Sequence, residues 1–431
     1  MESKDPRELL NFLGGWEGFE IDRWTINDEL APGPLGIALP SLTIELKPKD
    51  DFVKRCSRCG TPVEEVHDVV ERRVRDMPFG PYDLWLIFPQ SRLRCPRCGP
   101  TAEDIPWLDR YQRVTKRLSE LIGRFAQVMP IKRVAELLHV SWDTVKQIDK
   151  RSLSTRLGAM EEADFSRVRR IAIDEFALHR GQRYATLVVD VDTKRVLWVS
   201  RGRDADGLAG FFTALGAEGR ARIEAVVIDL ARPFVKAVKT HCPNAAIVYD
   251  LFHALMRYTA QVLDRVRMDE ANKIARPSHN HHRLNVENLR RIITGKGARW
   301  LLLRDRRNLN SPAERVRLEE LLAANKSLFV VYVLKEDLRE LWCLRDPVLA
   351  REAWESWYLR ASESGIAAVV RFANRLKLEA DYIINHALYP LHTSLLEGIN
   401  NKVKVMKRMA YGYRDEDYFF LKIRAAFPGI P

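Results

Sequence analysis

The sequence predicts a multidomain α/β protein, in which an all-α insertion interrupts a mixed sheet and two small modules precede that sheet. The chain has 431 residues, more than one ordinary hydrophobic core accommodates. Between residues 169 and 253, short apolar runs alternate with helical patterns, as they do in α/β layers. Residues 254–390 carry helical periodicity without the strand rhythm, which indicates the helical insertion.

The composition favours a protein that binds nucleic acid. The net charge is +12, and 70 Lys and Arg residues are spread along the chain. This balance favours a polyanionic partner over the alternative, a basic surface without such a partner. No run approaches about 18 uncharged apolar residues, and the start, MESKDPRELL, lacks the pattern of a signal peptide. We therefore expect a cytoplasmic protein without a membrane partner.

Residues 1–41 include the Pro- and Gly-rich run LAPGPLGIALP, and we expect an irregular N-terminal extension there. The segment SLTIELKP that follows alternates Leu42, Ile44 and Leu46 with polar residues, which predicts a strand. This strand begins the first predicted module, over residues 42–106.

Two matched cysteine knuckles identify this first module as a zinc ribbon. CSRCG and CPRCG each supply two thiolates, and each glycine allows the tight turn that points backbone amides at sulfur. The segments between the knuckles have strand-like composition. We expect one structural Zn²⁺; the alternative is four reduced cysteines packed together by chance. The expected ligands are Cys56, Cys59, Cys95 and Cys98.

The remaining candidates for thiol or zinc chemistry are weaker. His67 lies between the knuckles and could be an extra ligand, although a single His near a loop is more often surface. Cys242 and Cys343 have no partner in the pattern, and we expect both to be solitary buried thiols.

The second module, over residues 107–165, is predicted to be a helix-turn-helix. A helical pattern at 113–129 is followed by a short amphipathic helix that begins at Pro130, a turn, and a helix capped by Ser141. Packing of three helices without a DNA-binding role gives the same pattern. If the last helix enters a DNA groove, its exposed face offers Trp142, Thr144, Lys146 and Gln147.

The mixed sheet is predicted from five strands. RIAIDEF, RYATLVVDV and RVLWVS are expected to form three antiparallel strands, followed by IEAVVIDL and AAIVYDLFH after intervening helices. In such a sheet the first and fourth strands are neighbours, so Asp174 and Asp229 could meet at one edge. Paired carboxylates suit a site with two Mg²⁺ (or Mn²⁺) ions for phosphodiester chemistry.

A third carboxylate is expected from a helix near the C-terminus. Glu397 begins a polar stripe at helical spacing, and an apolar stripe lies opposite. This arrangement suits a metal ligand followed by a face that tracks phosphates. The local alternative is a capping box, because Ser394 and Glu397 have the required spacing. The polar stripe continues through Asn400, Asn401, Lys404 and Arg408, and the apolar stripe holds Ile399, Val403, Met406 and Ala410.

Four stretches of the chain together carry a resemblance to a known family. They are AIDEFALHRGQRYATLVVDVDTKRVLWVSRGRD, VVIDLARPFVKAV, PNAAIVYDLFH and LEGINNKVKVMKRMAYGYRDEDYF. With the cysteine knuckles and the helix-turn-helix, they resemble the ISL-three family of bacterial insertion-sequence transposases over about residues 42–425. The first 40 residues exceed the usual family start, and Leu395 stands where a small residue is commoner.

The resemblance implies a ribonuclease H-like catalytic domain with Asp174, Asp229 and Glu397 as its metal-binding DDE triad. This domain would span 166–254 and 391–431, interrupted by a helical insertion at 255–390. The family's D-x-F-H pattern implies that Asp250 and His253 lie near the site, where they would position DNA or the flanking helix. Their alternative roles are a strand-end acid and a buried structural histidine.

The expected function is that of a DNA transposase, which binds terminal inverted repeats and then cleaves and transfers DNA strands. Two DNA ends must be paired with a target, so at least a homodimer is expected, associated with the nucleoid when bound to DNA. A catalytically silent DNA-binding regulator descended from such an enzyme is the main alternative. A structure-selective nuclease on the same fold would share the metal site but lack strand transfer.

Overall fold

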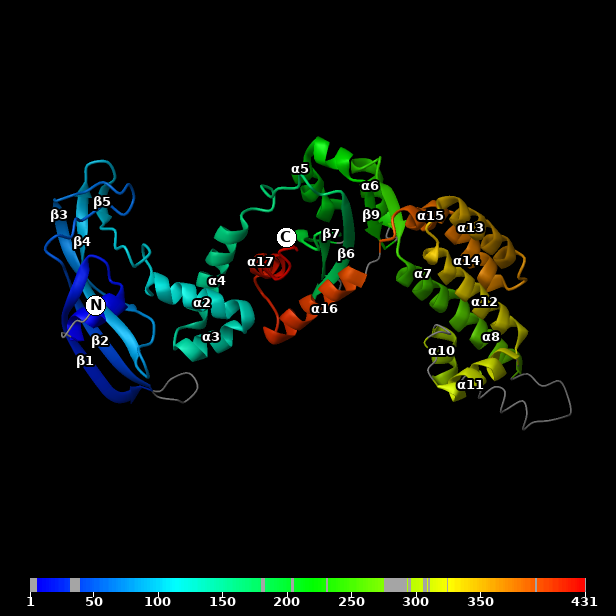
Figure 1. Cartoon of the computed structure of the whole chain (residues 1–431), viewed down its shortest axis with the longest axis horizontal. Coiled ribbons are helices and arrows are strands. Elements are labelled where there is room, and N and C mark those ends of the chain that lie inside the picture. The colour runs from blue at the N-terminus through cyan, green and yellow to red at the C-terminus, as the bar shows by residue number, and fades with distance from the viewer. Residues whose placement is uncertain are drawn as a thin grey trace. The chain divides into compact units, whose positions relative to one another are not determined.

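The computed structural model describes residues 6–31, 39–179, 183–202, 205–229, 232–274, 293, 296–304, 308, 311–323, 325–391 and 394–430 (Figure 1). The chain forms two compact units. The first comprises Met1–Arg156 and Lys407–Arg414, and the second comprises Leu157–Met406 and Asp415–Pro431. Within the described ranges, no helix is both long and apolar enough to cross a membrane.

The first unit contains a five-stranded sheet. The strand order is β1-β2-β4-β3, with β5 paired to β4; β2 and β4 are parallel and the other pairs are antiparallel. The strand expected before the first cysteine knuckle is confirmed as β2, and the strand-like segments between the two knuckles form β3 and β4. The bounds are β1 (Phe19–Ala31), β2 (Leu39–Pro48), β3 (Val66–Arg75), β4 (Asp83–Cys95) and β5 (Gly99–Ala102).

The expectation of an irregular extension over residues 1–41 is wrong for the described part of that segment. Helix α1 (Pro6–Gly14) lies there, and β1 pairs with β2 along most of its length. The physical reason is burial, because Phe19 and Ile21 pack with Ile44 of β2 in one core. The Pro- and Gly-rich run lies between the two strands, and residues 32–38 are outside the described residues.

The helix-turn-helix prediction is confirmed at the level of fold. Helices α2 (Lys116–Val128), α3 (Ile131–Leu138) and α4 (Trp142–Leu157) share one hydrophobic core. His139 adopts the left-handed conformation (φ 49°) in the turn between α3 and α4. Ser141 caps α4, since its hydroxyl accepts a hydrogen bond from the Thr144 amide at 3.1 Å.

Buried ionic contacts join the sheet of the first unit to these helices. Asp76 is fully buried and accepts hydrogen bonds from Trp16 Nε1 (2.9 Å), Thr115 Oγ1 (2.6 Å) and Arg117 Nε (2.6 Å). The neighbouring Arg75 donates to the carbonyl oxygen of Leu138, at the end of α3, at 3.1 Å. These contacts connect the N-terminal segment, the sheet and the helices, so the zinc ribbon and the helix-turn-helix belong to one compact body.

The second unit contains a five-stranded mixed sheet of order β10-β9-β6-β7-β8. β6, β7 and β8 pair antiparallel, whereas β9 lies parallel to both β6 and β10. All five predicted strands are confirmed, including the predicted neighbours β6 and β9. The bounds are β6 (Arg170–His179), β7 (Arg183–Asp190), β8 (Val196–Arg201), β9 (Ala225–Ile228) and β10 (Ala246–Tyr249).

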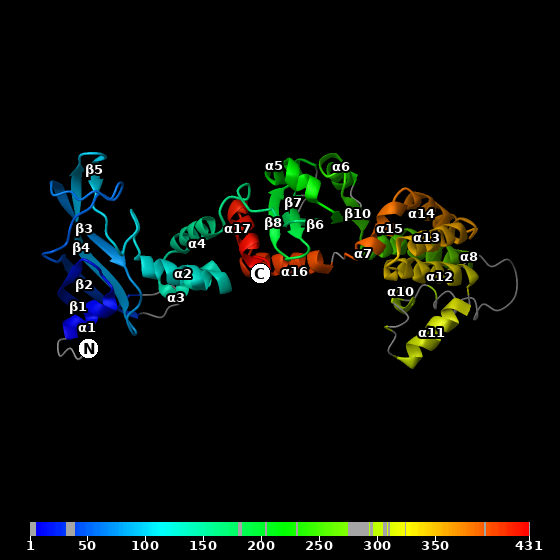
Figure 2. The ribbon, with the colours of Figure 1, turned by 45° about the horizontal axis from the view of Figure 1, so that its top comes forward.

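Helices cover both faces of this sheet. Residues of α5 (Ala205–Arg222) and α6 (Arg232–His241) form a core with Ile171 and Ile173 of β6. On the other face, Phe176 contacts Phe419 of α17 (Glu416–Ala426), with ring centroids 6.3 Å apart. Figure 2 shows α5 and α6 on one side of the sheet and α16 (Ser394–Met409) on the other. Strand alternation therefore directs even-numbered residues of β6 toward α16 and α17.

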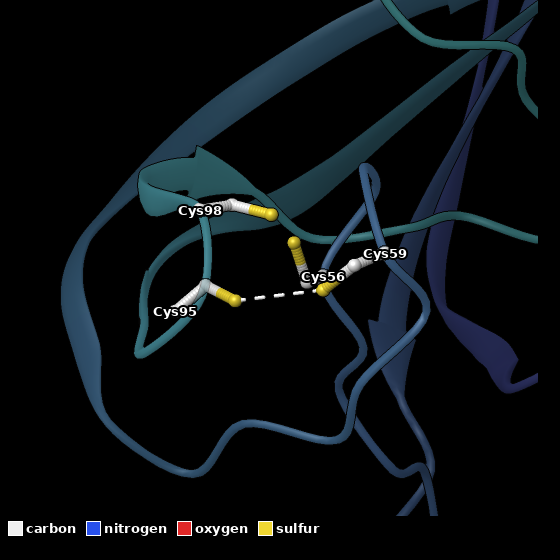
Figure 3. A group of neighbouring side chains, drawn as sticks. All are labelled: Cys56, Cys59, Cys95 and Cys98. Carbon is white, nitrogen blue, oxygen red and sulfur yellow. Dashed lines mark hydrogen bonds between the residues drawn. The ribbon is translucent and has the colours of Figure 1, made fainter.

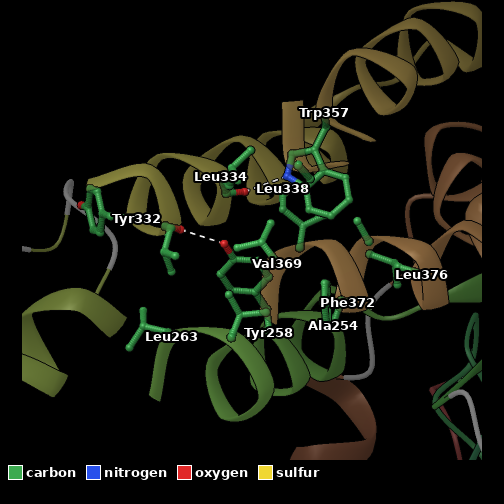
Figure 4. Packing of buried hydrophobic residues seen from close by; sticks show 14 of the residues in the cluster. Ala254, Tyr258, Leu263, Tyr332, Leu334, Leu338, Trp357, Val369, Phe372 and Leu376 are labelled. Atoms are coloured by element: carbon green, nitrogen blue, oxygen red, sulfur yellow. Dashed lines mark hydrogen bonds between the residues drawn. The ribbon is translucent and has the colours of Figure 1, made fainter. Parts of the chain in front are cut away.

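The helices expected over residues 255–390 are confirmed, and within the described residues this helical segment contains no strand. Figure 4 shows part of its core, where the Tyr258 hydroxyl donates to the Val331 carbonyl (2.9 Å) and Trp357 Nε1 donates to the Leu334 carbonyl (2.8 Å). Its elements are α7 (Leu251–Tyr258), the π-helical turn Thr259–Leu263, α8 (Asp264–Ile274), α10 (Lys296–Leu303), α11 (Pro312–Ala323), α12 (Lys326–Glu340), the 3₁₀ turn Leu341–Cys343, α13 (Pro347–Ser362), α14 (Ala367–Lys377) and α15 (Ala380–Leu388).

The two solitary cysteines differ from each other. Cys242 is buried, as expected, and burial raises the pKa of its thiol to about 11. Cys343 is exposed, which contradicts the expectation of a buried thiol. The residue lies at the end of the 3₁₀ turn, where Leu341 and Trp342 take the buried positions.

Removal of the Asp76 carboxylate should destabilise the first unit. We expect Asp76→Ala to lower its free energy of unfolding by about 3–5 kcal/mol, because Arg117 and two neutral donors lose a buried partner. Asp109 is the matched control, since its side chain is half-exposed and lies 3.9 Å from Lys116 Nζ. Asp109→Ala should cost about 0–1 kcal/mol. Equal losses in chemical unfolding of the two variants would contradict this interpretation.

Candidate functional site

The register of two parallel strands brings two acidic residues to one edge of the sheet. β6 pairs with β9 from Arg170↔Ala225 to Ile173↔Ile228. Asp174 and Asp229 each follow the last pair, so they occupy equivalent positions where the strands' pairing ends. Because Ile173 and Ile228 both contribute to the core under α5 and α6, the two acids that follow them face the opposite side of the sheet.

The Asp174 carboxylate is held by two donors. Oδ1 accepts from the Glu175 amide at 2.8 Å, and Oδ2 accepts from Asn400 Nδ2 of α16 at 2.7 Å. Burial raises the pKa of Asp174, and the negative charge of Asp229 adds to this effect. The two hydrogen bonds and the charge of His253 act in the opposite direction.

The residues at this edge fit a divalent cation. Asp229 Oδ1 and Asn400 Oδ1 are both buried and have no hydrogen-bond partner among the described residues. A buried oxygen without a partner costs about 1–3 kcal/mol, and two carboxylates at one edge repel each other. Carboxylate and amide oxygens bind hard divalent cations, and a cation would relieve both penalties.

Glu397 does not join this pair in the structure. It lies in the first turn of α16 and its side chain is exposed. Among the described residues, only the four knuckle cysteines form a group of three or more His, Cys, Asp or Glu with ligand atoms within 4.8 Å of one another. The capping alternative depends on the side chain of Ser394. The structure describes the backbone of this residue but not its side chain.

The two faces of α16 follow the predicted stripes, with one exception. Ile399 and Val403 are buried, and Asn401 is exposed, as are Lys404 and Arg408. The exception is Asn400, which belongs to the predicted polar stripe but contacts Asp174 in the structure. The position of Asn400, three residues after Glu397 and beside the buried Ile399, is a sequence signal that its side chain faces the sheet.

Asp250 and His253 lie at the same edge of the sheet. Tyr249 of β10 pairs with Ile228, so Asp250 follows β10 just as Asp229 follows β9. Asp250 is buried, which contrasts with the half-buried His253 in the first turn of α7. The charge of His253 lowers the pKa of Asp174, which places the imidazole in the electrostatic environment of the carboxylate pair.

The four knuckle cysteines converge in the first unit (Figure 3). The Sγ atoms of Cys59 and Cys95 are 3.6 Å apart, close to the edge of about 3.8 Å expected for tetrahedral zinc–thiolate coordination. The Arg58 amide points at Cys56 Sγ (3.4 Å), and Gly60 has φ 70°, as the knuckle geometry requires. The residues present therefore fit one structural zinc ion.

The thiols of the cluster differ in proton affinity. Hydrogen bonds to Thr61 lower the pKa of Cys59 to about 6, whereas the hydrogen bond with Cys59 and burial raise the pKa of Cys98 to about 12. Thiols packed this closely cannot all ionise without a cation. His67 is outside the group: it is half-exposed and lies 3.3 Å from Asp68.

The predicted reading face of α4 is accessible. Trp142 is 48% exposed and Gln147 is exposed, whereas Thr144 and Lys146 are partly exposed. The Lys146 ammonium lies 5.7 Å from the centre of the Trp142 ring. An aromatic ring beside a cation on the second helix of the motif suits contact with a DNA groove.

Comparisons with known proteins agree along the whole chain. Residues 171–423 match a family described as transposase, residues 103–153 match the helix-turn-helix domain of transposase family ISL3, and residues 53–98 match the zinc finger of transposases IS204/IS1001/IS1096/IS1165. The chain is 45% identical, over 98% of both sequences, to the transposase for insertion sequence element IS1001 of Bordetella parapertussis. It is 29% identical to the transposase for IS1557 of Mycobacterium tuberculosis, over 86% of this chain and 84% of that protein.

The cysteine cluster predicts one zinc ion per chain. Cys98→Ser should lose it, because a structural site needs all four ligands. Cys343→Ser is the matched control, since this exposed thiol lies outside the cluster. Metal analysis of purified protein measures both. Full zinc content in the Cys98 variant would contradict the assignment.

The raised pKa of Asp174 predicts that this group's contribution to stability falls as pH rises through its folded-state pKa. At pH 7 without added divalent cations, the ionised carboxylate therefore destabilises the second unit. We expect Asp174→Asn to raise the melting temperature there. A melting temperature equal to or below that of the wild type would show that the carboxylate carries no such cost.

Proposed function

Because this chain belongs to the ISL3 family of insertion-sequence transposases, we propose that it binds the terminal inverted repeats of its element and cleaves and transfers DNA strands at a metal-dependent carboxylate site. The observation that carries the proposal is the register of β6 and β9, which aligns Asp174 with Asp229. Asp229 retains a buried oxygen without a described partner, as a cation ligand would.

We propose that the catalytic domain is ribonuclease H-like. Three antiparallel strands followed by two parallel ones, in the order β8-β7-β6-β9-β10, support this assignment. The domain would span residues 166–254 and 391–431, on either side of the insertion at 255–390. The family match over residues 171–423 extends into all three parts.

The proposed roles follow from position. Asp174 and Asp229 hold the cations at the end of the paired strands, and Glu397 of α16 completes the DDE triad. Two Mg²⁺ or Mn²⁺ ions bound there would supply Lewis-acid activation of water and of the 3′-hydroxyl, and would offset charge on the leaving oxygen. Asp250 and His253 support the site from β10 and α7.

DNA recognition is assigned to the first unit and to α16. The zinc ribbon (42–106) and the helix-turn-helix (107–165) would read the inverted repeats, with α4 in the major groove. The exposed stripe of Asn401, Lys404 and Arg408 would contact phosphates of the transposon end or the target. A homodimer or higher oligomer in the bacterial cytoplasm, nucleoid-associated when bound to DNA, would pair the two ends.

One observation favours a second candidate, a catalytically silent DNA-binding regulator. Glu397 is exposed and does not share a cluster with the two aspartates. A regulator of this kind would need the first unit but no third carboxylate. The two candidates differ in DNA cleavage and agree in DNA binding.

Cleavage of labelled DNA carrying the element's ends tests the proposal. We expect cutting in Mg²⁺ that falls to background in Asp174→Asn, Asp229→Asn and Glu397→Gln, because each change removes one cation ligand. Binding of the same DNA by all three variants should match the wild type. Tight binding without any cutting by the wild-type protein would favour the regulator, and full cutting by Glu397→Gln would remove that residue from the triad.

A further inference from the structure

Asn400 and Asn401 are adjacent amides on α16, yet their environments differ. Asn401 is exposed, whereas Asn400 is half-buried and its Nδ2 donates to Asp174 Oδ2 at 2.7 Å. A hydrogen bond to an ionised acceptor is stronger and shorter than one between neutral groups. Asn400 is therefore positioned by its contact with Asp174, whereas Asn401 faces solvent.

This contact provides a donor for the second oxygen of the Asp174 carboxylate. One oxygen accepts from the Glu175 amide of β6, and the other accepts from Asn400 of α16. Two donors on different oxygens restrict rotation of the carboxylate plane. The Glu175 amide is part of β6 itself, whereas Asn400 belongs to α16. The orientation of the Asp174 carboxylate therefore depends on the position of α16.

The second amide atom of Asn400 supports the same conclusion. Its Oδ1 is buried and, within the described ranges, has no hydrogen-bond partner; Asp229 Oδ1 is in the same state. Buried oxygens without partners are uncommon, and a bound cation or water would satisfy them. Asp229 lies at the sheet edge, and Asn400 contacts Asp174 from α16; carboxylate and amide oxygens bind divalent cations or accept hydrogen bonds from cation-bound waters.

We propose that Asn400 is a positioning residue of the metal site, an inference that rests on the proposed function. Its amide N–H group holds Asp174 in the orientation that the cation needs, and its amide oxygen serves the cation or a water bound to it. Glu397 precedes Asn400 by three residues, about 4.5 Å along the helix axis. The contact therefore also limits how far α16 can rotate about its axis, and Glu397 lies on the same face of the helix as Asn400.

Mn²⁺ binding to the full-length, zinc-loaded protein without DNA tests this role. Free Mn²⁺ is measured by electron paramagnetic resonance during titration. We expect Asn400→Ala to weaken Mn²⁺ binding about 10- to 100-fold, the range for residues that orient metal ligands. Asn401→Ala is the matched control and should stay within about twofold of the wild type, because its amide faces solvent.

DNA binding without divalent cations provides the complementary readout. Asn401→Ala should weaken binding to end-containing DNA, whereas Asn400→Ala should bind it like the wild type. The opposite pattern, with lost DNA binding and unchanged Mn²⁺ affinity in Asn400→Ala, would make Asn400 a DNA contact and overturn the proposal.

A nearly isosteric variant keeps the test valid if the alanine variant folds poorly. Asn400→Asp removes the donor and places a third negative charge beside Asp174. We expect it to melt at a lower temperature than the wild type without divalent cations, and to gain more from Mn²⁺. An identical Mn²⁺-induced rise in melting temperature in the wild type and in Asn400→Asp would overturn the role of Asn400.

Failure of this inference is distinguishable from failure of the proposed function. If the wild type and Asp174→Asn bind Mn²⁺ equally, or neither binds it, the metal site itself is refuted, together with the role of Asn400. If the wild type binds Mn²⁺ through Asp174 and Asn400→Ala binds it equally well, the metal site stands and only the role of Asn400 is refuted.

Discussion

The parallel pairing of β6 with β9 fixes the positions of Asp174 and Asp229, and the rest of the candidate site depends on it. A shift of one residue in this register would turn Asp229 toward the hydrophobic core under α5 and α6. That core therefore specifies the site: Ile173 and Ile228 must be buried together, and the acids that follow them must then share the opposite face. Hydrophobic packing on one side of the sheet determines the charge arrangement on the other.

The helical segment 255–390 separates the two aspartates from α16 in sequence. In space, however, the chain leaves the sheet after β10 and the helical segment contacts β10 again. Trp342 Nε1 donates to the Tyr249 carbonyl at 3.0 Å, and Asn385 Nδ2 donates to the Ile247 carbonyl at 2.9 Å. Both contacts anchor the insertion to β10, the strand beside β9. The return of the chain near the sheet lets α16 reach Asp174 through Asn400.

Much of this arrangement could be predicted because its determinants are local. Apolar patterns and strand-like composition identified all five strands of the second sheet and β2, β3 and β4 of the first, and the paired knuckles identified the four thiols that converge. The errors arose where tertiary packing decides. Burial of Phe19 against β2 makes β1 a strand despite the Pro- and Gly-rich run that follows, and helical periodicity alone could not show which of two adjacent amides, Asn400 or Asn401, contacts the sheet. The exposure of Cys343 likewise depends on its neighbours in the fold.

The most direct test of the account is the location of a bound cation. Anomalous X-ray scattering from crystals of the protein soaked in Mn²⁺ would locate that ion independently of catalysis. If the strand register builds a metal site, an anomalous peak will lie in contact with the carboxylates of both Asp174 and Asp229. Strong Mn²⁺ peaks elsewhere, with none at this edge of the sheet, would contradict the claim that strand register builds a metal site here.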